Sequence, residues 1–207
     1  MLPSKIVCLA RSFRLHAEEL GNEVPTSPLF FLKAPSAVIG PGEAIVLPSV
    51  SSEIHHEAEV AIVIGNRLSQ ADETEAKQGI GAWTILNDVT ARDLQRLDQG
   101  RFTRAKGYDT FCPIANERLL ELDWMNARIQ CYVDGEQRQD GALSDLIFSP
   151  TMVLVAISRV MTLMPGDIVS LGTPAGVGPL LQGNTVEVRL VDGVGRTLLS
   201  LENPVVR

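Results

Sequence analysis

Two glutamates separated by one residue stand directly before a short apolar run, and this arrangement constrains the chain more than any other. Glu57 and Glu59 lead into residues 60–64, which read VAIVI and are followed by Gly65. A short β-branched run that ends at glycine predicts a buried strand. Alternate side chains of a strand share a face, so the two carboxylates would stand side by side. Their repulsion favours either access to solvent or a bound divalent cation.

A third acid follows the next apolar run. Residues 83–86 predict a strand, and Asp88 comes two residues after it, before a helix predicted over residues 91–97. A strand-to-helix junction is a rigid place to hold a functional carboxylate. Arg92 and Gln95 would share one face of this helix. If neither residue had a functional role, Asp88 would be an acidic residue in a loop and Arg92 a cation on the surface.

The remaining patterns predict an α+β fold that is mainly β, in one domain over residues 1–207. Alternation and apolar runs indicate strands, and Asp134-Gly135 predicts a type I′ hairpin turn. Helices are expected over residues 11–21 and 151–163. Two further helices would begin at the capping boxes Ser69/Asp72 and Thr90/Asp93. The other predicted strands cover residues 5–10, 30–33, 129–133, 136–139, 168–171, 186–190 and 198–201, with short strands and turns over 35–48.

Composition excludes several classes of partner. The chain has 18 basic and 25 acidic residues, a net charge of -7, and no basic stripe. Nucleic acid and anionic membranes are therefore not expected partners. Cys8, Cys112 and Cys131 are widely spaced and lie in apolar surroundings, which indicates reduced core thiols. The N-terminal apolar run, residues 6–10, is too short for a signal or a membrane span, so we expect a cytoplasmic protein.

Four motifs in a fixed order carry a family resemblance: residues 55–59, 88–95, 105–109 and 166–178. They run over nearly the whole chain. On these motifs the sequence resembles the fumarylacetoacetate hydrolase family, and specifically its small single-domain acylpyruvate hydrolases. The resemblance implies a twisted β-roll with flanking short helices, a homodimer, and a bound Mg²⁺ or Mn²⁺.

The resemblance also implies a role for ten side chains. The three metal ligands would be Glu57, Glu59 and Asp88. The catalytic residues would be His16 and Glu19, on a helix that orders over the site, together with Lys106. The contacts to a small 2-oxo-acid substrate would come from Arg11, Arg92, Gln95 and Thr173. One departure is Ser12-Phe13, where many relatives have Asn-Tyr, and this change could alter the substrate's contacts.

The chemistry of these residue types agrees with the resemblance. Three carboxylates without histidine or cysteine suit a hard octahedral cation that keeps open positions. A 2-oxo acid can chelate such a cation, which then stabilises an enolate. In a 2,4-dioxo acid, His16 held by Glu19 would take a proton from water. That water attacks C4, and cleavage of the C3–C4 bond gives pyruvate and a carboxylic acid.

Other reactions pass through the same enolate. Decarboxylation or tautomerisation of oxaloacetate would use the same metal chelate, as would isomerisation or decarboxylation of a 2-hydroxy-dienoate. A catalytically idle scaffold that binds a small acid is a further alternative. The presence of His16 together with all three acids argues against it, because an idle scaffold has no need of them.

Overall fold

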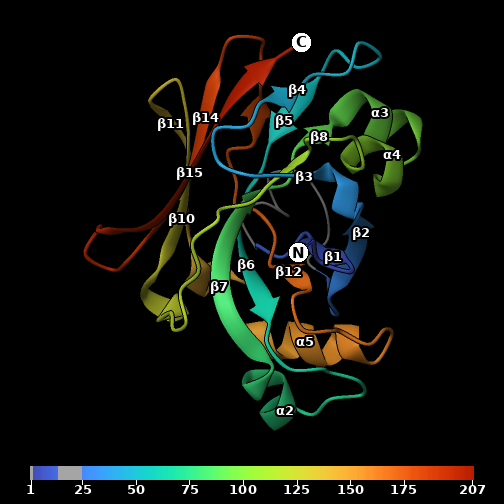
Figure 1. The fold of residues 1–207 in the computed structure, drawn as a ribbon, viewed down its shortest axis with the longest axis vertical. Coiled ribbons are helices and arrows are strands. Elements are labelled where there is room, and N and C mark those ends of the chain that lie inside the picture. Colours follow the sequence, from blue (N-terminus) through green and yellow to red (C-terminus); the bar gives the residue numbers. More distant parts are fainter. Residues whose placement is uncertain (1, 14–24) are drawn as a thin grey trace.

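The computed structural model describes residues 2–13 and 25–207, and its architecture is built on two five-stranded sheets (Figure 1). The first sheet contains the first strand of the chain. Strand β1 (Ile6–Ala10) runs parallel to β12 (Ile168–Ser170), and every other neighbouring pair in this sheet is antiparallel. The strand order is β2 (Leu29–Lys33), β1 (Ile6–Ala10), β12 (Ile168–Ser170), β6 (Ala58–Ile64) and β7 (Ile80–Asn87).

The second sheet is made mainly from the C-terminal third of the chain. Its side chains alternate strictly between buried and partly exposed along β10, the pattern of a strand with one face on a core. Asp134 and Gly135 both have positive φ in the turn before β11, as a type I′ hairpin requires. The strand order is β11 (Glu136–Ala142), β10 (Arg128–Val133), β14 (Thr185–Val191), β15 (Thr197–Val206) and β4 (Ile45–Val46).

The main core lies where these sheets face each other. Strands β6 and β7 contact β10, β14 and β15. Ile62 of β6 and Val188 of β14 are buried in one hydrophobic cluster. The preceding residue of β6, Ala61, points the other way into a second cluster with Ile6 of β1. Both faces of the first sheet are therefore buried near β6, which explains why its sequence is a continuous apolar run.

Two small sheets and several short helices complete the structure. One small sheet joins β13 (Gly178–Pro179), β5 (Ile54–His56) and β8 (Thr90–Ala91), and the other pairs β3 (Val38–Ile39) with β9 (Cys112–Pro113). The α-helices in the described part of the chain are α2 (Glu73–Gln78), α3 (Arg92–Leu97), α4 (Phe102–Lys106) and α5 (Pro150–Ser158). Single 3₁₀ turns cover Pro35–Ala37, Trp124–Asn126 and Leu143–Asp145. The α+β, mainly β prediction is confirmed.

The helix boundaries differ from the predictions. The capping box of α2 is formed by Asp72 and Glu75, so the prediction of Ser69 as its first residue is wrong. Helix α3 has no side-chain cap, because the Thr90 hydroxyl instead donates to the Asp88 carbonyl. Helix α5 ends at Ser158, five residues early.

The helix expected over residues 11–21 falls largely outside the described residues. Within the described part, Phe13 pairs with Leu146 in an isolated bridge and the Ser12 hydroxyl donates to the Leu171 carbonyl. These residues are therefore not the helical start that the sequence indicated. No helix among residues 2–13 and 25–207 has the length and apolarity needed to cross a membrane.

Candidate active site

A cavity of about 120 Å³ opens where strands β1, β2 and β6 meet helices α3 and α4. Seven of the ten predicted site residues line it: Arg11, Glu57, Glu59, Arg92, Gln95, Lys106 and Thr173. An eighth, Asp88, follows β7 and is fully buried behind the cavity wall. The structure thus brings together residues that are separated by up to 162 positions in the sequence.

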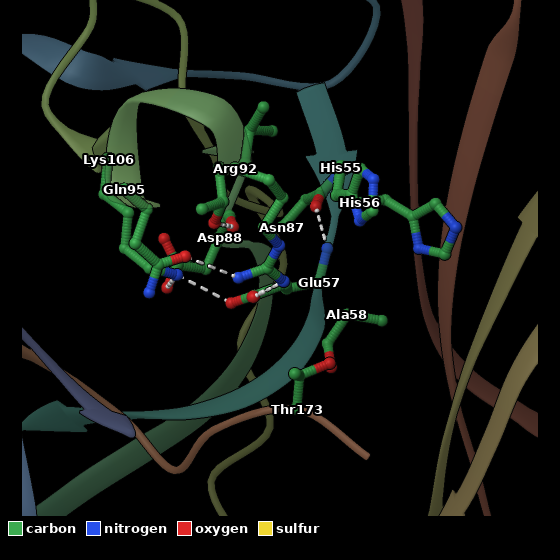
Figure 2. Close-up of polar contacts among 12 residues, drawn as sticks. His55, His56, Glu57, Ala58, Asn87, Asp88, Arg92, Gln95, Lys106 and Thr173 are labelled. Carbon is green, nitrogen blue, oxygen red and sulfur yellow. Dashed lines mark hydrogen bonds and ion pairs between the residues drawn. The ribbon is translucent and has the colours of Figure 1, made fainter. Parts of the chain in front are cut away.

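Glu57 and Glu59 reach this cavity in a way that the sequence pattern does not show. Strand β5 ends at His56 and β6 begins at Ala58, so Glu57 occupies the junction between two sheets. The expectation that both glutamates lie within one continuous strand is wrong. Both side chains nevertheless line the same cavity. Figure 2 shows the chain bending at Glu57, between the two strands.

The acids come from different elements of the fold, but their side chains are buried close together. Glu59 is 1% exposed and its carboxylate accepts a hydrogen bond from the Ser170 hydroxyl. Burial raises the pKa of Glu59 well above its usual range, and the negative charges of Asp88 and Glu57 raise it further. A group of carboxyls that disfavours its own ionisation in this way is electrostatically prepared for a cation.

Lys106 lies between two of these acids. It is the last residue of α4, and its ammonium is 2.7 Å from Glu57 Oε2 and 2.5 Å from Asp88 Oδ2 (Figure 2). Burial alone would lower the pKa of Lys106, but the carboxylates of Asp88 and Glu57 outweigh it and raise that pKa above its ordinary value. Lys106 is therefore a permanent cation at neutral pH.

Arg92 supplies a second cation from the first turn of α3. Its guanidinium contacts the Glu57 carboxylate, and its Nη1 also donates to Gln95 Oε1 at 3.0 Å. The predicted shared face of Arg92 and Gln95 is confirmed by this contact. Figure 2 shows both side chains directed toward Glu57 and Lys106.

A third cation, Lys33, was missed by the sequence reasoning. It ends strand β2, its side chain is fully buried, and its ammonium is 2.6 Å from Asp88 Oδ1. The same ammonium donates to the Lys106 carbonyl at 2.7 Å. A lysine at the end of the apolar run FFLK was the available signal, since a buried lysine requires a charged partner.

The donor atoms present fit a hard divalent cation. Ligand atoms of Glu59, Asp88 and Cys8 lie within 4.8 Å of one another, and Glu57 lies on the same cavity. Burial raises the pKa of the Cys8 thiol, and the neighbouring Asp88 and Glu59 raise it further, so this sulfur stays protonated and is a poor ligand. Carboxylate oxygens remain, and these are what Mg²⁺ and Mn²⁺ prefer.

The three cysteines behave as the sequence indicated. Cys8, Cys112 and Cys131 are free and buried.

Two of the ten predicted site residues, His16 and Glu19, lie outside the described residues, and their role stays a prediction.

Comparison with known proteins identifies the family. The family model described as fumarylacetoacetate (FAA) hydrolase, C-terminal, matches residues 5–206. The chain belongs to this family. Members of the fumarylacetoacetate hydrolase family act on oxo-acid substrates as hydrolases, isomerases or decarboxylases, and they use divalent metals.

Relatives within the fumarylacetoacetate hydrolase family carry different activities in their names. The mitochondrial oxaloacetate tautomerase of Arabidopsis thaliana is 40% identical over 188 residues, 88% of this chain and 84% of that protein. The structure of 5-carboxymethyl-2-hydroxymuconate delta-isomerase from Mycobacterium smegmatis is 42% identical with a TM-score of 0.89, covering 100% of this chain and 80% of that one.

A third relative was crystallised with ligands. The structure of fumarylpyruvate hydrolase from Pseudomonas aeruginosa in complex with Mn²⁺ and pyruvate has a TM-score of 0.88 at 28% identity, covering 99% of this chain and 90% of that one. Family membership therefore establishes a fold and a class of oxo-acid chemistry, but it does not distinguish among the reactions within that class.

Proposed function

We propose that this chain is a divalent-metal-dependent hydrolase that cleaves acylpyruvates to pyruvate and a carboxylic acid. The observation that carries the proposal is the buried group of Glu57, Glu59 and Asp88 beside a small cavity that also holds Lys106 and Arg92. The Mn²⁺ and pyruvate in the related fumarylpyruvate hydrolase support both the metal and the product.

The charges of the site support an anionic substrate. Lys33, Lys106 and Arg92 contact the acid group, so three positive charges balance its three negative ones. Arg92 and Lys106 were expected at this site from the sequence, and the contact of Lys33 with Asp88 adds a third positive charge. Adding a divalent cation would leave about two positive charges, which a substrate carrying a carboxylate and a developing enolate would balance.

Each residue has a distinct task in this reaction. When bound by Glu57, Glu59 and Asp88, Mg²⁺ or Mn²⁺ would supply a Lewis acid. Arg92 and Lys106 would bind the anionic oxygens of the substrate, and Lys106 would stabilise the charge that grows as the C3–C4 bond breaks. His16 would take the proton from the attacking water, and Glu19 would orient the imidazole.

A second candidate is oxaloacetate tautomerisation, favoured by the tautomerase of Arabidopsis thaliana at 40% identity. This reaction moves a proton between C3 and the 2-oxo oxygen and breaks no C–C bond. It would use the same metal ligands and the same cationic side chains, but it needs no attacking water.

Product analysis separates the candidates. The purified protein would be incubated with Mg²⁺ or Mn²⁺ and with a panel of acylpyruvates, oxaloacetate and 2-hydroxy-dienoates. Formation of pyruvate and the matching acid from an acylpyruvate, lost in Asp88→Ala, supports hydrolysis. Rapid interconversion of oxaloacetate tautomers without cleavage of any acylpyruvate would replace hydrolysis by tautomerisation.

A further inference from the structure

One buried amide reaches the bend at Glu57 from the opposite sheet. Gln139 lies on β11, is 1% exposed, and points from the second sheet toward the start of β6. It does not line the cavity that holds the acids, and the sequence carried no sign of a role for it.

All four hydrogen-bonding positions of the Gln139 carboxamide are used. Its Oε1 accepts from the Ala58 amide at 3.0 Å and contacts His56 Nδ1 at 3.0 Å. Its Nε2 donates to Thr173 Oγ1 at 2.8 Å and to the Pro174 carbonyl at 2.9 Å. A backbone N–H only donates and a carbonyl only accepts, so the amide orientation is fixed and His56 Nδ1 is the donor.

Thr173 closes this network into a ring. Its hydroxyl accepts from Gln139 and donates its proton to the Ala58 carbonyl at 2.9 Å. Figure 2 shows Thr173 beside Ala58. Ala58 is therefore held at both its N–H and its C=O, and it is the residue between Glu57 and Glu59. In this arrangement the Thr173 proton is used by the Ala58 carbonyl, and the contact of Thr173 with a substrate stays a prediction.

The loop that carries Thr173 is packed tightly on β11. A Cβ atom at Gly176 would lie 2.2 Å from the Arg138 carbonyl oxygen, and one at Gly141 would lie 2.3 Å from Pro174 Cβ. Only glycine permits these approaches. The backbone of the glycine-rich stretch 172–178 thus packs directly against β11. This close packing keeps Thr173 and Pro174 within hydrogen-bonding distance of the Gln139 side chain.

We propose that Gln139 is a positioning residue of the active site, holding the Glu57–Glu59 segment and the Thr173 loop in one arrangement. The inference rests on the proposed function, because it assumes that Glu57 and Glu59 bind a divalent cation. Loss of a side chain that orients metal ligands typically weakens metal binding by about 10- to 100-fold. The bend at Glu57 has no continuous strand to hold it, so we expect an effect within this range.

The test uses Mn²⁺ alone as the probe, with free ion measured by electron paramagnetic resonance on the full chain. Gln139→Met keeps the length of the side chain and removes all four contacts, and we expect its Kd for Mn²⁺ to rise about 10-fold or more. The matched control is Asn203→Leu. Asn203 is also a buried amide, and it donates to the Gly40 and Glu43 carbonyls at 2.8 Å, away from the cavity.

A second variant separates the contacts that the Gln139 side-chain oxygen accepts from those that its side-chain nitrogen donates. In Gln139→Glu the carboxylate can still accept from Ala58 and His56, but it cannot donate to Thr173 or Pro174. We expect weaker Mn²⁺ binding here as well, together with a raised KM for the substrate. Thr173→Val should weaken Mn²⁺ binding in the wild-type chain but add little in Gln139→Met, because either change opens the same ring.

The outcomes are distinct. An unchanged Kd for Mn²⁺ in folded Gln139→Met, or an equal change in Asn203→Leu, would overturn the positioning role. If Asn203→Leu folds and neither Gln139 variant does, Gln139 is a structural residue and the inference is also overturned. If the wild-type protein itself binds no Mn²⁺, the proposed function fails instead.

Discussion

The ammonium of Lys106 contacts Glu57 and Asp88 at the cavity, so it is the cation best placed to meet a substrate anion. In Lys106→Met we expect a higher KM and a kcat reduced by at least 10-fold, because the charge would serve both the bound substrate and the developing enolate. Steady-state kinetics on the substrate found by the panel measures both constants. The control is Arg104→Met, on the same helix but exposed and paired with Asp98. Wild-type kinetics in Lys106→Met would make Lys106 a structural residue.

Lys33 serves stability more directly, since its side chain is fully buried against Asp88. Lys33→Met should lower the free energy of unfolding by about 3 kcal/mol, near the lower end for a broken buried pair, because Asp88 keeps its contact with Lys106. Reversible urea denaturation measures the change. Lys5→Met removes a comparable 2.6 Å pair with Asp167, but Lys5 is 23% exposed and should cost less. Equal losses in the two variants would contradict this ranking.

The sequence predicted most of the polar residues that line the cavity, because the motif residues have recognisable types and spacing. Glu57, Glu59 and Asp88 could be proposed from their positions beside apolar runs. Lys33 carried only the signal of a lysine that ends an apolar run, and Gln139 carried none, because the contacts of these two residues span 55 and 81 positions. A buried polar side chain reveals its partner only when the fold is known.

At the scale of elements, strands were predicted better than helix ends. Alternation of apolar residues located β14, and the turns at Asp134-Gly135 and Asp192-Gly193 located β10 and β15 beside them. The capping box of α2 was displaced by three residues. Both Ser69/Asp72 and Asp72/Glu75 have the right spacing, but the second pair has a glutamate that reaches back to the cap N–H.

Asp167 anchors the first strand, and its ionisation should appear in the pH dependence of stability. Burial opposes ionisation, but hydrogen bonds from Lys5, Ser4 and the Met164 amide outweigh it, so the pKa of Asp167 lies below its usual value. A depressed folded-state pKa adds stability that is present above the unfolded pKa, about 3.9, and is lost as the pH falls through the folded value.

The measurement compares wild type with Asp167→Asn by urea denaturation between pH 6 and pH 2.5. We expect the variant to be less stable at pH 6 and the difference to shrink below about pH 4. Asp140→Asn is the control, since Asp140 pairs with Arg128 on an exposed part of β11. A difference that stays constant down to pH 2.5 would show that Asp167 acts through its shape and not through its charge.

At the scale of the whole molecule, the site exists because separate sheets meet at one bend. Residues 54–64 read as one extended segment, yet β5 pairs with β13 and β8 while β6 pairs with β7 and β12. No local pattern marks Glu57 as the point of change, because the strands that pair on either side of it come from distant parts of the chain. Eight of the ten residues that the family resemblance indicated lie at the cavity or directly behind its wall, and the three-dimensional structure shows how they are held there.

The choice between hydrolysis and simpler enolate chemistry depends on His16. The described residues supply the predicted metal ligands and the cations around them, which oxaloacetate chemistry and acylpyruvate hydrolysis would share. Hydrolysis additionally needs a base for the attacking water. We therefore expect His16→Ala to lose acylpyruvate hydrolysis by about 100-fold or more, the typical contribution of a general base, and to retain much of any oxaloacetate activity.

Binding measurements decide how that loss arises. His16→Ala should bind Mn²⁺ and oxalate, which resembles the enolate of pyruvate, with nearly wild-type affinity, because neither needs a proton acceptor. Glu18→Ala, two residues along the same predicted helix, is the matched control and should keep wild-type hydrolysis. If His16→Ala hydrolyses acylpyruvates at the wild-type rate, another group activates the water. If it loses oxalate as well, His16 belongs to the binding residues, and the loss of hydrolysis reflects a substrate that is no longer held beside Lys106 and Arg92.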